Sequence, residues 1–339
     1  KTAKILNPLK PIILPKKIRA KLSPFPNAKP IKTVRNHSLA VPAGILSASR
    51  RTDIPGWYTP WFLDQIEKGC FFVTNPFNRQ SRRVDATPKE IHTIVFWSKN
   101  YGPFLDLSAH KILAQKGFHL FFNFTINTPL KDLEPGLPDL SERLTQARRI
   151  ARDLSPVQVA WRFDPICFYE KGGRVFNNLD AFEDIAGQLA QMGIKQCITS
   201  FYDPYKKVAA RIKRMGESGR PMLKFIDPGM DRKTKIIRSM AQSLKHLGMD
   251  LFLCCEKELM ETAGLQAYAS PNACINGHLY KALFGGNPET RGDYGQRRQK
   301  GCQCTKSFDI GSYEDHPCFH NCLFCYARTG LDITEPATG

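Results

Sequence analysis

The stretch Val157-Gln-Val-Ala-Trp-Arg-Phe163 is an apolar run of the length of a buried strand. A second such run, Ile194-Lys-Gln-Cys-Ile-Thr-Ser-Phe201, lies further along the chain. Between them, ahead of Gly193, apolar residues recur at helical spacing: Phe182, Ile185, Ala186, Leu189 and Met192. A strand, a crossover helix and a second strand in this order are typical of a parallel sheet. Residues 157–201 therefore predict an α/β fold.

The same alternation extends along most of the chain. Four further apolar runs of strand length are Ile45–Ser49, Thr93–Ser98, His119–Ile126 and Met249–Cys254. Ahead of the last run, helical spacing recurs at Ile237, Met240, Ala241, Leu244 and Leu247. Six strand–helix units suit an open barrel, so we predict a partial (β/α)6 TIM-like barrel over residues 45–270. The stretch Phe71–Val84 is more typical of a hairpin insertion than of a barrel strand.

The composition is that of a globular protein with an excess of positive charge. The chain of 339 residues has 42% hydrophobic residues and a formal net charge of +18. Residues 1–44 form an arm rich in proline that holds ten Lys and Arg and no acidic residue. The arm is either a solvated tail or a segment that neutralises nucleic-acid phosphates or another polyanion. No apolar run approaches the roughly 20 residues of a membrane span, so we expect none. The odd number of cysteines argues against a secreted disulfide framework and for a reducing compartment, so we expect a cytoplasmic protein.

Polar residues follow each predicted strand. They include Arg50, Arg51, Asp53, Lys99, Asn127, Arg162, Asp164 and Tyr205. In a parallel barrel the carboxyl ends of the strands share one rim, where ligands bind. The alternative is that these residues only cap helices at ordinary polar strand ends.

We assign each rim residue a candidate role. Arg50 and Arg51 suit a carboxylate or phosphate, because guanidinium groups make forked hydrogen bonds to oxyanions. Asp53 is a candidate catalytic residue. Arg162 and Asp164 are candidates for orienting a cofactor or substrate, as is Lys99. Asn127 and Tyr205 are candidate cofactor-binding residues.

Eight of the eleven cysteines lie in the last 86 residues. We treat residues 271–339 as a cysteine-rich segment, and Cys254 and Cys255 precede it. Cys318, Cys322 and Cys325 have the spacing C-x3-C-x2-C. Three thiolates on a tight loop can hold three irons of a [4Fe–4S] cluster and leave the fourth iron open to S-adenosylmethionine (SAM). The alternatives are an electron-transfer cluster with a fourth cysteine, and a structural zinc site that recruits His316 or His320.

The cysteine motif resembles that of a known enzyme group. The stretch Asp309–Ala327 resembles the cluster motif of the spore photoproduct lyase-like branch of radical SAM proteins. Residues from about 44 onward also resemble a bacterial family catalogued only as a domain of unknown function, on the segments Ser47–Pro55, Asn75–Phe77, Phe96–Asn100 and Trp161–Pro165. The resemblance implies a radical SAM-like partial barrel.

One feature departs from the radical SAM pattern. Those proteins carry the three cysteines just after their first barrel strand, whereas here only 14 residues follow Cys325. The segment must therefore fold back over the barrel mouth to bring the cysteines to the rim.

A second set of cysteines consists of Cys255, Cys274, Cys302 and Cys304. Four thiols suit a second iron–sulfur cluster or a zinc ion that fastens the C-terminal segment to the sixth strand. The alternative is that these are core residues and free thiols.

The leading hypothesis is an iron–sulfur enzyme of radical SAM type that acts on an unknown substrate, nucleic acid or another phosphate-bearing molecule included. It would need an electron donor such as ferredoxin or flavodoxin. The alternatives are a nucleic-acid-binding protein with structural clusters and an electron-transfer protein within a larger assembly.

Overall fold

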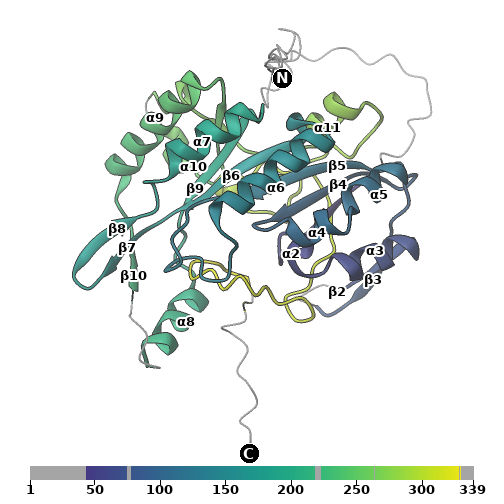
Figure 1. Cartoon of the computed structure of the whole chain (residues 1–339), viewed down its shortest axis with the longest axis horizontal. Coiled ribbons are helices and arrows are strands. Elements are labelled where there is room, and N and C mark those ends of the chain that lie inside the picture. Colours follow the sequence, from purple (N-terminus) through teal and green to yellow (C-terminus); the bar gives the residue numbers. More distant parts are fainter. Residues whose placement is uncertain (1–42, 75–77, 218–222, 263, 328, 330–339) are drawn as a thin grey trace, which may run out of the picture.

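The computed structural model describes residues 43–74, 78–217, 223–262, 264–327 and 329 (Figure 1). The predicted basic arm therefore lies outside the described residues, except for residues 43 and 44. The helices are α2 (Ile54–Trp57), α3 (Thr59–Glu67), α4 (Gly102–Asp106), α5 (Ala109–Gln115), α6 (Leu140–Asp153), α7 (Phe182–Gln191), α8 (Lys206–Glu217), α9 (Met230–His246), α10 (Lys257–Glu261) and α11 (Gly277–Phe284).

The strands fall into three sheets among the described residues. They are β1 (Gly44–Ala48), β2 (Cys70–Thr74), β3 (Ser81–Asp85), β4 (Ile91–Ser98), β5 (His119–Thr125), β6 (Val159–Ile166), β7 (Phe168–Lys171), β8 (Arg174–Asn177), β9 (Gln196–Phe201), β10 (Leu223–Ile226), β11 (Asp250–Leu253), β12 (Ser270–Pro271) and β13 (Phe308–Asp309).

The main sheet has eight parallel strands in the order β12-β11-β9-β6-β5-β4-β1-β13. The six strands predicted from apolar runs lie side by side in their chain order, from β1 to β11. The predicted α/β fold with a parallel sheet is thus confirmed. Among the described residues the two edge strands, β12 and β13, do not pair with each other, so the sheet is open.

Two smaller sheets interrupt this alternation. The predicted hairpin insertion is present as β2 and β3, which pair antiparallel. A second antiparallel sheet, β10-β7-β8, was not predicted. Its hairpin turns at Gly172 and Gly173, both at positive φ, a conformation that glycine adopts without steric cost.

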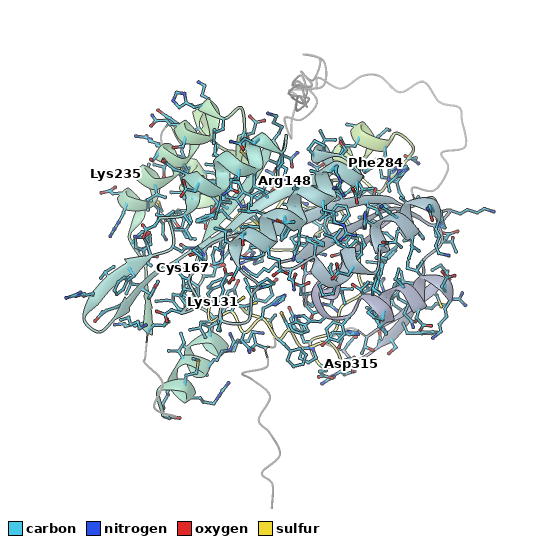
Figure 2. All side chains as sticks on the ribbon, in the orientation of Figure 1. Lys131, Arg148, Cys167, Lys235, Phe284 and Asp315 are labelled. Atoms are coloured by element: carbon cyan, nitrogen blue, oxygen red, sulfur yellow. The ribbon has the colours of Figure 1, made fainter. Side chains whose placement is uncertain are left out.

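The hydrophobic core lies on both faces of the main sheet, because alternate residues of a strand point to opposite sides. On β4, Ile94 and Phe96 belong to the core cluster that also includes residues of α3 to α7 and of α9. Val95 belongs to the other cluster, with Trp97 packed against it. Figure 2 shows the side chains that fill the space between the sheet and the helices.

Residues of the cysteine-rich segment cover the second face of the sheet. Ile275, Leu279 and Tyr280, at or near α11, pack there against Val95 and Phe121. The segment then supplies β13, which pairs parallel to β1 and extends the sheet beyond it. Sequence-distant parts of the chain, the first strand and the last, are therefore neighbours in the fold.

Among the described residues, no helix combines the length and the apolar character that crossing a membrane requires.

We expect the folded protein to lose stability as the pH falls below about 6.5. Burial lowers the pKa of His92, His110 and His119. The unfolded chain then binds protons that the folded chain does not, so stability decreases on acidification by at most about 1.4 kcal/mol per pH unit for each histidine. Urea unfolding at pH 7 and pH 5 measures this slope. His110→Phe should reduce the slope, and an equal slope in that variant would contradict the assignment to His110.

Candidate functional site

A cavity of about 520 Å³ lies at the carboxyl ends of the parallel strands. Seven of the eight predicted rim residues line it: Arg50, Arg51, Asp53, Lys99, Arg162, Asp164 and Tyr205. Both predicted cysteine sets line it as well: Cys318, Cys322 and Cys325, and Cys255, Cys274, Cys302 and Cys304. The structure therefore brings nearly all the predicted site residues to one cavity.

Asn127 is the rim residue that the structure places elsewhere. Its side chain is fully buried and binds the backbone of Asp164 on both sides. The Asn127 side chain donates to the Asp164 carbonyl at 3.1 Å and accepts from the Asp164 amide at 2.6 Å. Asn127 thus holds the end of β6 in position behind the cavity wall.

Asp53 joins three parts of the site. Its carboxylate caps α2 by accepting from the Gly56 amide at 2.8 Å, and it accepts from the Lys99 amide at 3.0 Å at the end of β4. It also lies 2.8 Å from Nε2 of His320, on the loop that carries the first three cysteines. In this arrangement Asp53 fixes the position of the loop.

Asp309, at the edge of the sheet, also accepts several hydrogen bonds. It accepts from the hydroxyls of Ser47 and Ser49, at 3.0 and 2.5 Å, and from the amide of Arg50 at 2.8 Å. The Arg50 guanidinium also lies 3.4 Å from this carboxylate. Arg50 is therefore held against β13, and it is one of the residues that line the cavity.

The first cysteine set lies on an irregular loop after β13. Cys318 and Cys322 are buried and Cys325 is half-buried. Burial raises the pKa of the Cys318 and Cys322 thiols, so the metal-free thiols favour the protonated form. Metal binding would release those protons, as it does wherever thiols become ligands.

A buried group of charges lies beside Cys322. Glu134 is 2% exposed, and its carboxylate lies 2.5 Å from the Lys99 ammonium, 3.8 Å from the Arg143 guanidinium and 3.9 Å from the Cys322 sulfur. Burial lowers the pKa of Lys99, but Glu134 and Cys322 outweigh it and the pKa is raised. Two cations thus face one carboxylate, which leaves an excess positive charge next to the thiols.

Arg211 of α8 fastens the cysteine loop. Its side chain is fully buried and donates to four backbone carbonyls of the loop, those of Cys322, Leu323, Cys325 and Ala327, at 2.9 to 3.4 Å. Figure 1 shows α8 beside the yellow C-terminal segment, below the body of the sheet. A helix inserted after β9 therefore holds the loop from the outside.

The second cysteine set surrounds the end of β11. Cys255 adopts a left-handed φ of 61°, which breaks the strand alternation and turns its thiol to the same cavity as that of Cys254. The Cys254 sulfur lies 3.9 Å from that of Cys255 and 3.4 Å from that of Cys274. Cys302 contacts Cys255 and Cys304 by hydrogen bonds between thiols. A fifth thiol, Cys254, therefore joins the four that were predicted.

Arg162 provides positive charge at this second set. Its guanidinium donates to the Cys274 sulfur at 3.0 Å and pairs with Asp164. Hydrogen bonds from Cys254 and Cys304, together with the Arg162 charge, outweigh burial and lower the pKa of the Cys274 thiol well below its ordinary range. At Cys274 the site thus stabilises the thiolate, the form that binds metal, whereas the pKa of the Cys254, Cys255 and Cys304 thiols is raised.

The thiols of the two cysteine sets are suitable metal ligands, but their positions do not form a coordination site. All eleven cysteines are free thiols, and eight of them line the cavity. Within the described residues, no three His, Cys, Asp or Glu side chains already converge as a metal-binding group. Cofactor binding therefore stays a prediction. Of the three cysteines outside these sets, Cys167, labelled in Figure 2, and Cys197 are buried, and Cys70 is half-buried.

Several site residues were not predicted as such: Glu134, Arg143, Arg211, Cys254 and Asp309. His320 was considered only as an alternative zinc ligand, and its Nε2 instead lies against Asp53. A signal existed for Cys254, which adjoins Cys255 at the end of a predicted strand, and for Asp309, which begins the stretch that resembles the cluster motif. Glu134, Arg143 and Arg211 lie in polar stretches that look like solvated surface.

The fold and the cavity define an α/β protein with two sets of cysteines at the carboxyl end of a parallel sheet. Over residues 45–327 the chain matches the family described as Domain of unknown function (DUF1848), and it belongs to that family. No curated protein matches the sequence.

One solved structure with a distant likeness is that of D-psicose 3-epimerase from Clostridium cellulolyticum H10, determined with D-tagatose. It shares 10% sequence identity, and the match covers 73% of this chain and 62% of the epimerase chain. The TM-score is 0.24, which is too low to carry an argument about fold or activity.

Proposed function

We propose that this protein is an iron–sulfur enzyme of radical SAM type. The observation that carries the proposal is the buried charge beside Cys322, where Lys99 and Arg143 face the single carboxylate of Glu134. Buried charges need compensation. A cluster held by three thiolates is anionic, and bound at Cys318, Cys322 and Cys325 it would supply that compensation.

The proposal extends to the sheet and to the second cysteine set. We infer that the six strands in chain order, β1 to β11, form the partial barrel, with the cavity at its mouth. Cys255, Cys274, Cys302 and Cys304 would hold a second metal group, with Cys254 as a neighbouring thiol and Arg162 as the adjacent cation. The close contacts among these thiols support this assignment.

The chemistry that the first group supplies when bound and reduced is an electron that cleaves the C5′–S bond of SAM, giving methionine and a 5′-deoxyadenosyl radical that takes a hydrogen atom from the substrate. The chain's own residues do the remaining work. Asp53 and Arg211 fix the cysteine loop from its two sides. Lys99 and Glu134 provide charge beneath it, and the cavity walls exclude bulk water.

The test is SAM cleavage under anaerobic conditions. Protein reconstituted with iron and sulfide and reduced with dithionite should release 5′-deoxyadenosine and methionine from SAM, measured by mass spectrometry. The matched control is the variant in which Cys318, Cys322 and Cys325 are replaced by Ala. Iron-loaded protein that releases no 5′-deoxyadenosine would contradict the proposal and favour a structural or electron-transfer cluster.

A further inference from the structure

Three residues that line the cavity each have a buried hydrogen-bond donor with no acceptor among the described residues. The donors are Nη1 of Arg50, Oγ1 of Thr52 and Nε1 of Trp97. Guanidinium and indole nitrogens only donate, and the threonine hydroxyl can donate as well. Burying a donor without an acceptor costs free energy, and such groups in native proteins usually face a ligand or water.

The carboxylates on the same wall are already engaged. Asp53 and Asp309 each accept several hydrogen bonds from neighbouring strands and loops. Asp164 pairs with Arg162 and accepts from Ser200, and Asp203 accepts from Arg297 and Lys300 at 2.6 and 2.8 Å. The carboxylates that line the cavity thus have hydrogen-bond partners, whereas the three donors named above have none among the described residues.

Arg51 adds a positive charge to the lining of the cavity. Its guanidinium donates to the Gly311 carbonyl at 3.1 Å, and no carboxylate in the described part of the chain lies within ion-pair distance of it. Arg51 and Thr52 follow β1, next to Arg50, while Trp97 lies near the end of β4, the neighbouring strand. The unpaired donors therefore come from two adjacent strand ends.

We propose that the cavity recognises its substrate through an oxyanion, a carboxylate or a phosphate, held by Arg50, Arg51 and the indole of Trp97, with Thr52 as a further donor. The inference rests on the proposed function only in calling the ligand a substrate. An oxyanion offers several acceptor atoms at once, and Arg pairs with it by charge as well as by hydrogen bonds.

The thiols of the second set are the competing acceptors for these donors. The Arg50 pKa is raised because Asp309, Cys304 and other nearby acidic groups outweigh the effect of burial, so Arg50 lies within the electrostatic reach of that set. Arg162 already donates to Cys274 from this side, and its guanidinium stacks 5.2 Å from the Trp97 ring. If Arg50 and Trp97 serve the thiol site, they do not bind a small anion.

The test measures anion binding by the full chain, reconstituted anaerobically, without SAM or reductant. The probes are inorganic phosphate and succinate, each compared with KCl at equal ionic strength, and the readouts are thermal unfolding and tryptophan fluorescence. We expect at least one probe to stabilise the protein saturably. Arg51→Gln and Trp97→Phe should each weaken that binding about tenfold, whereas Arg79→Gln, an exposed arginine paired with Glu314, should leave it unchanged.

The outcomes distinguish a phosphate-bearing ligand from a carboxylate, and they test the anion site separately from the proposed SAM cleavage. Saturation by phosphate alone identifies a phosphate-bearing ligand, and saturation by succinate alone identifies a carboxylate. Binding of neither probe, or equal binding by wild type, Arg51→Gln and Trp97→Phe, overturns the inference. Because no SAM is cleaved in this assay, its result is independent of whether the protein releases 5′-deoxyadenosine.

Discussion

Replacing Cys318, Cys322 and Cys325 together by Ala is expected to remove about four irons per chain and all SAM cleavage, because a [4Fe–4S] cluster does not persist without its thiolates. The loop should stay in place, since Arg211 binds its backbone carbonyls and not the thiols. Iron and sulfide analysis with EPR, with and without SAM, measures the change. The spectra of the wild type also report whether one iron is open to SAM.

The control for this variant is Cys70→Ala, which removes a half-buried cysteine that does not line the cavity. It should keep the iron content of the wild type. Unchanged iron in the triple variant would show that the first cysteine set holds no cluster.

Single replacement of Cys255, Cys274, Cys302 or Cys304 by Ala is expected to loosen the C-terminal segment from the sheet. A shared metal would join the end of β11 to residues 274–304, so losing any one ligand would remove its contribution to stability. Limited proteolysis should then cleave within residues 271–309 while the remaining sheet stays protected. The iron or zinc content should fall in all four variants.

Cys254→Ala is the matched comparison for that set. Cys254 contacts two of the four cysteines but was not among the predicted ligands. If the four predicted thiols are sufficient, this variant keeps its metal and its protease resistance. A protected segment in all four ligand variants would instead identify these residues as ordinary core thiols.

The strands of the main sheet were predictable from the sequence because parallel strands are buried on both faces and leave apolar runs. Thr93–Ser98 and Ile194–Phe201 match β4 and β9 to within two residues at each end. The strands β7, β8 and β10 were not predicted, because they are short and partly exposed. Val175 and Phe176 of β8 are 54% and 42% exposed, so no buried run marks the strand.

The candidate site was predictable where residues follow strands and where the cysteines cluster in the sequence. Arg50 and Lys99 lie just beyond β1 and β4, and topology alone brings such strand ends to one edge. Arg162 lies within β6, which runs on to Ile166. The partners of the site residues come from elsewhere: Glu134 lies in the connection after β5, and Arg211 on a basic helix whose sequence resembles a solvated face. Contacts of this kind depend on tertiary packing, which leaves no local pattern.

The pairing of β1 with β13 also determines the order in which the protein can mature during synthesis. Ser47 and Asp309 hydrogen bond across 262 residues of chain. While the polypeptide emerges from the ribosome, the outer edge of β1 has no neighbour, and an unpaired strand edge is prone to associate with other chains. Cys302, Cys304 and the three cysteines of the loop are also translated last. A metal at the second cysteine set would therefore have to wait until translation has passed residue 304, and a cluster at the first set until it has passed residue 325.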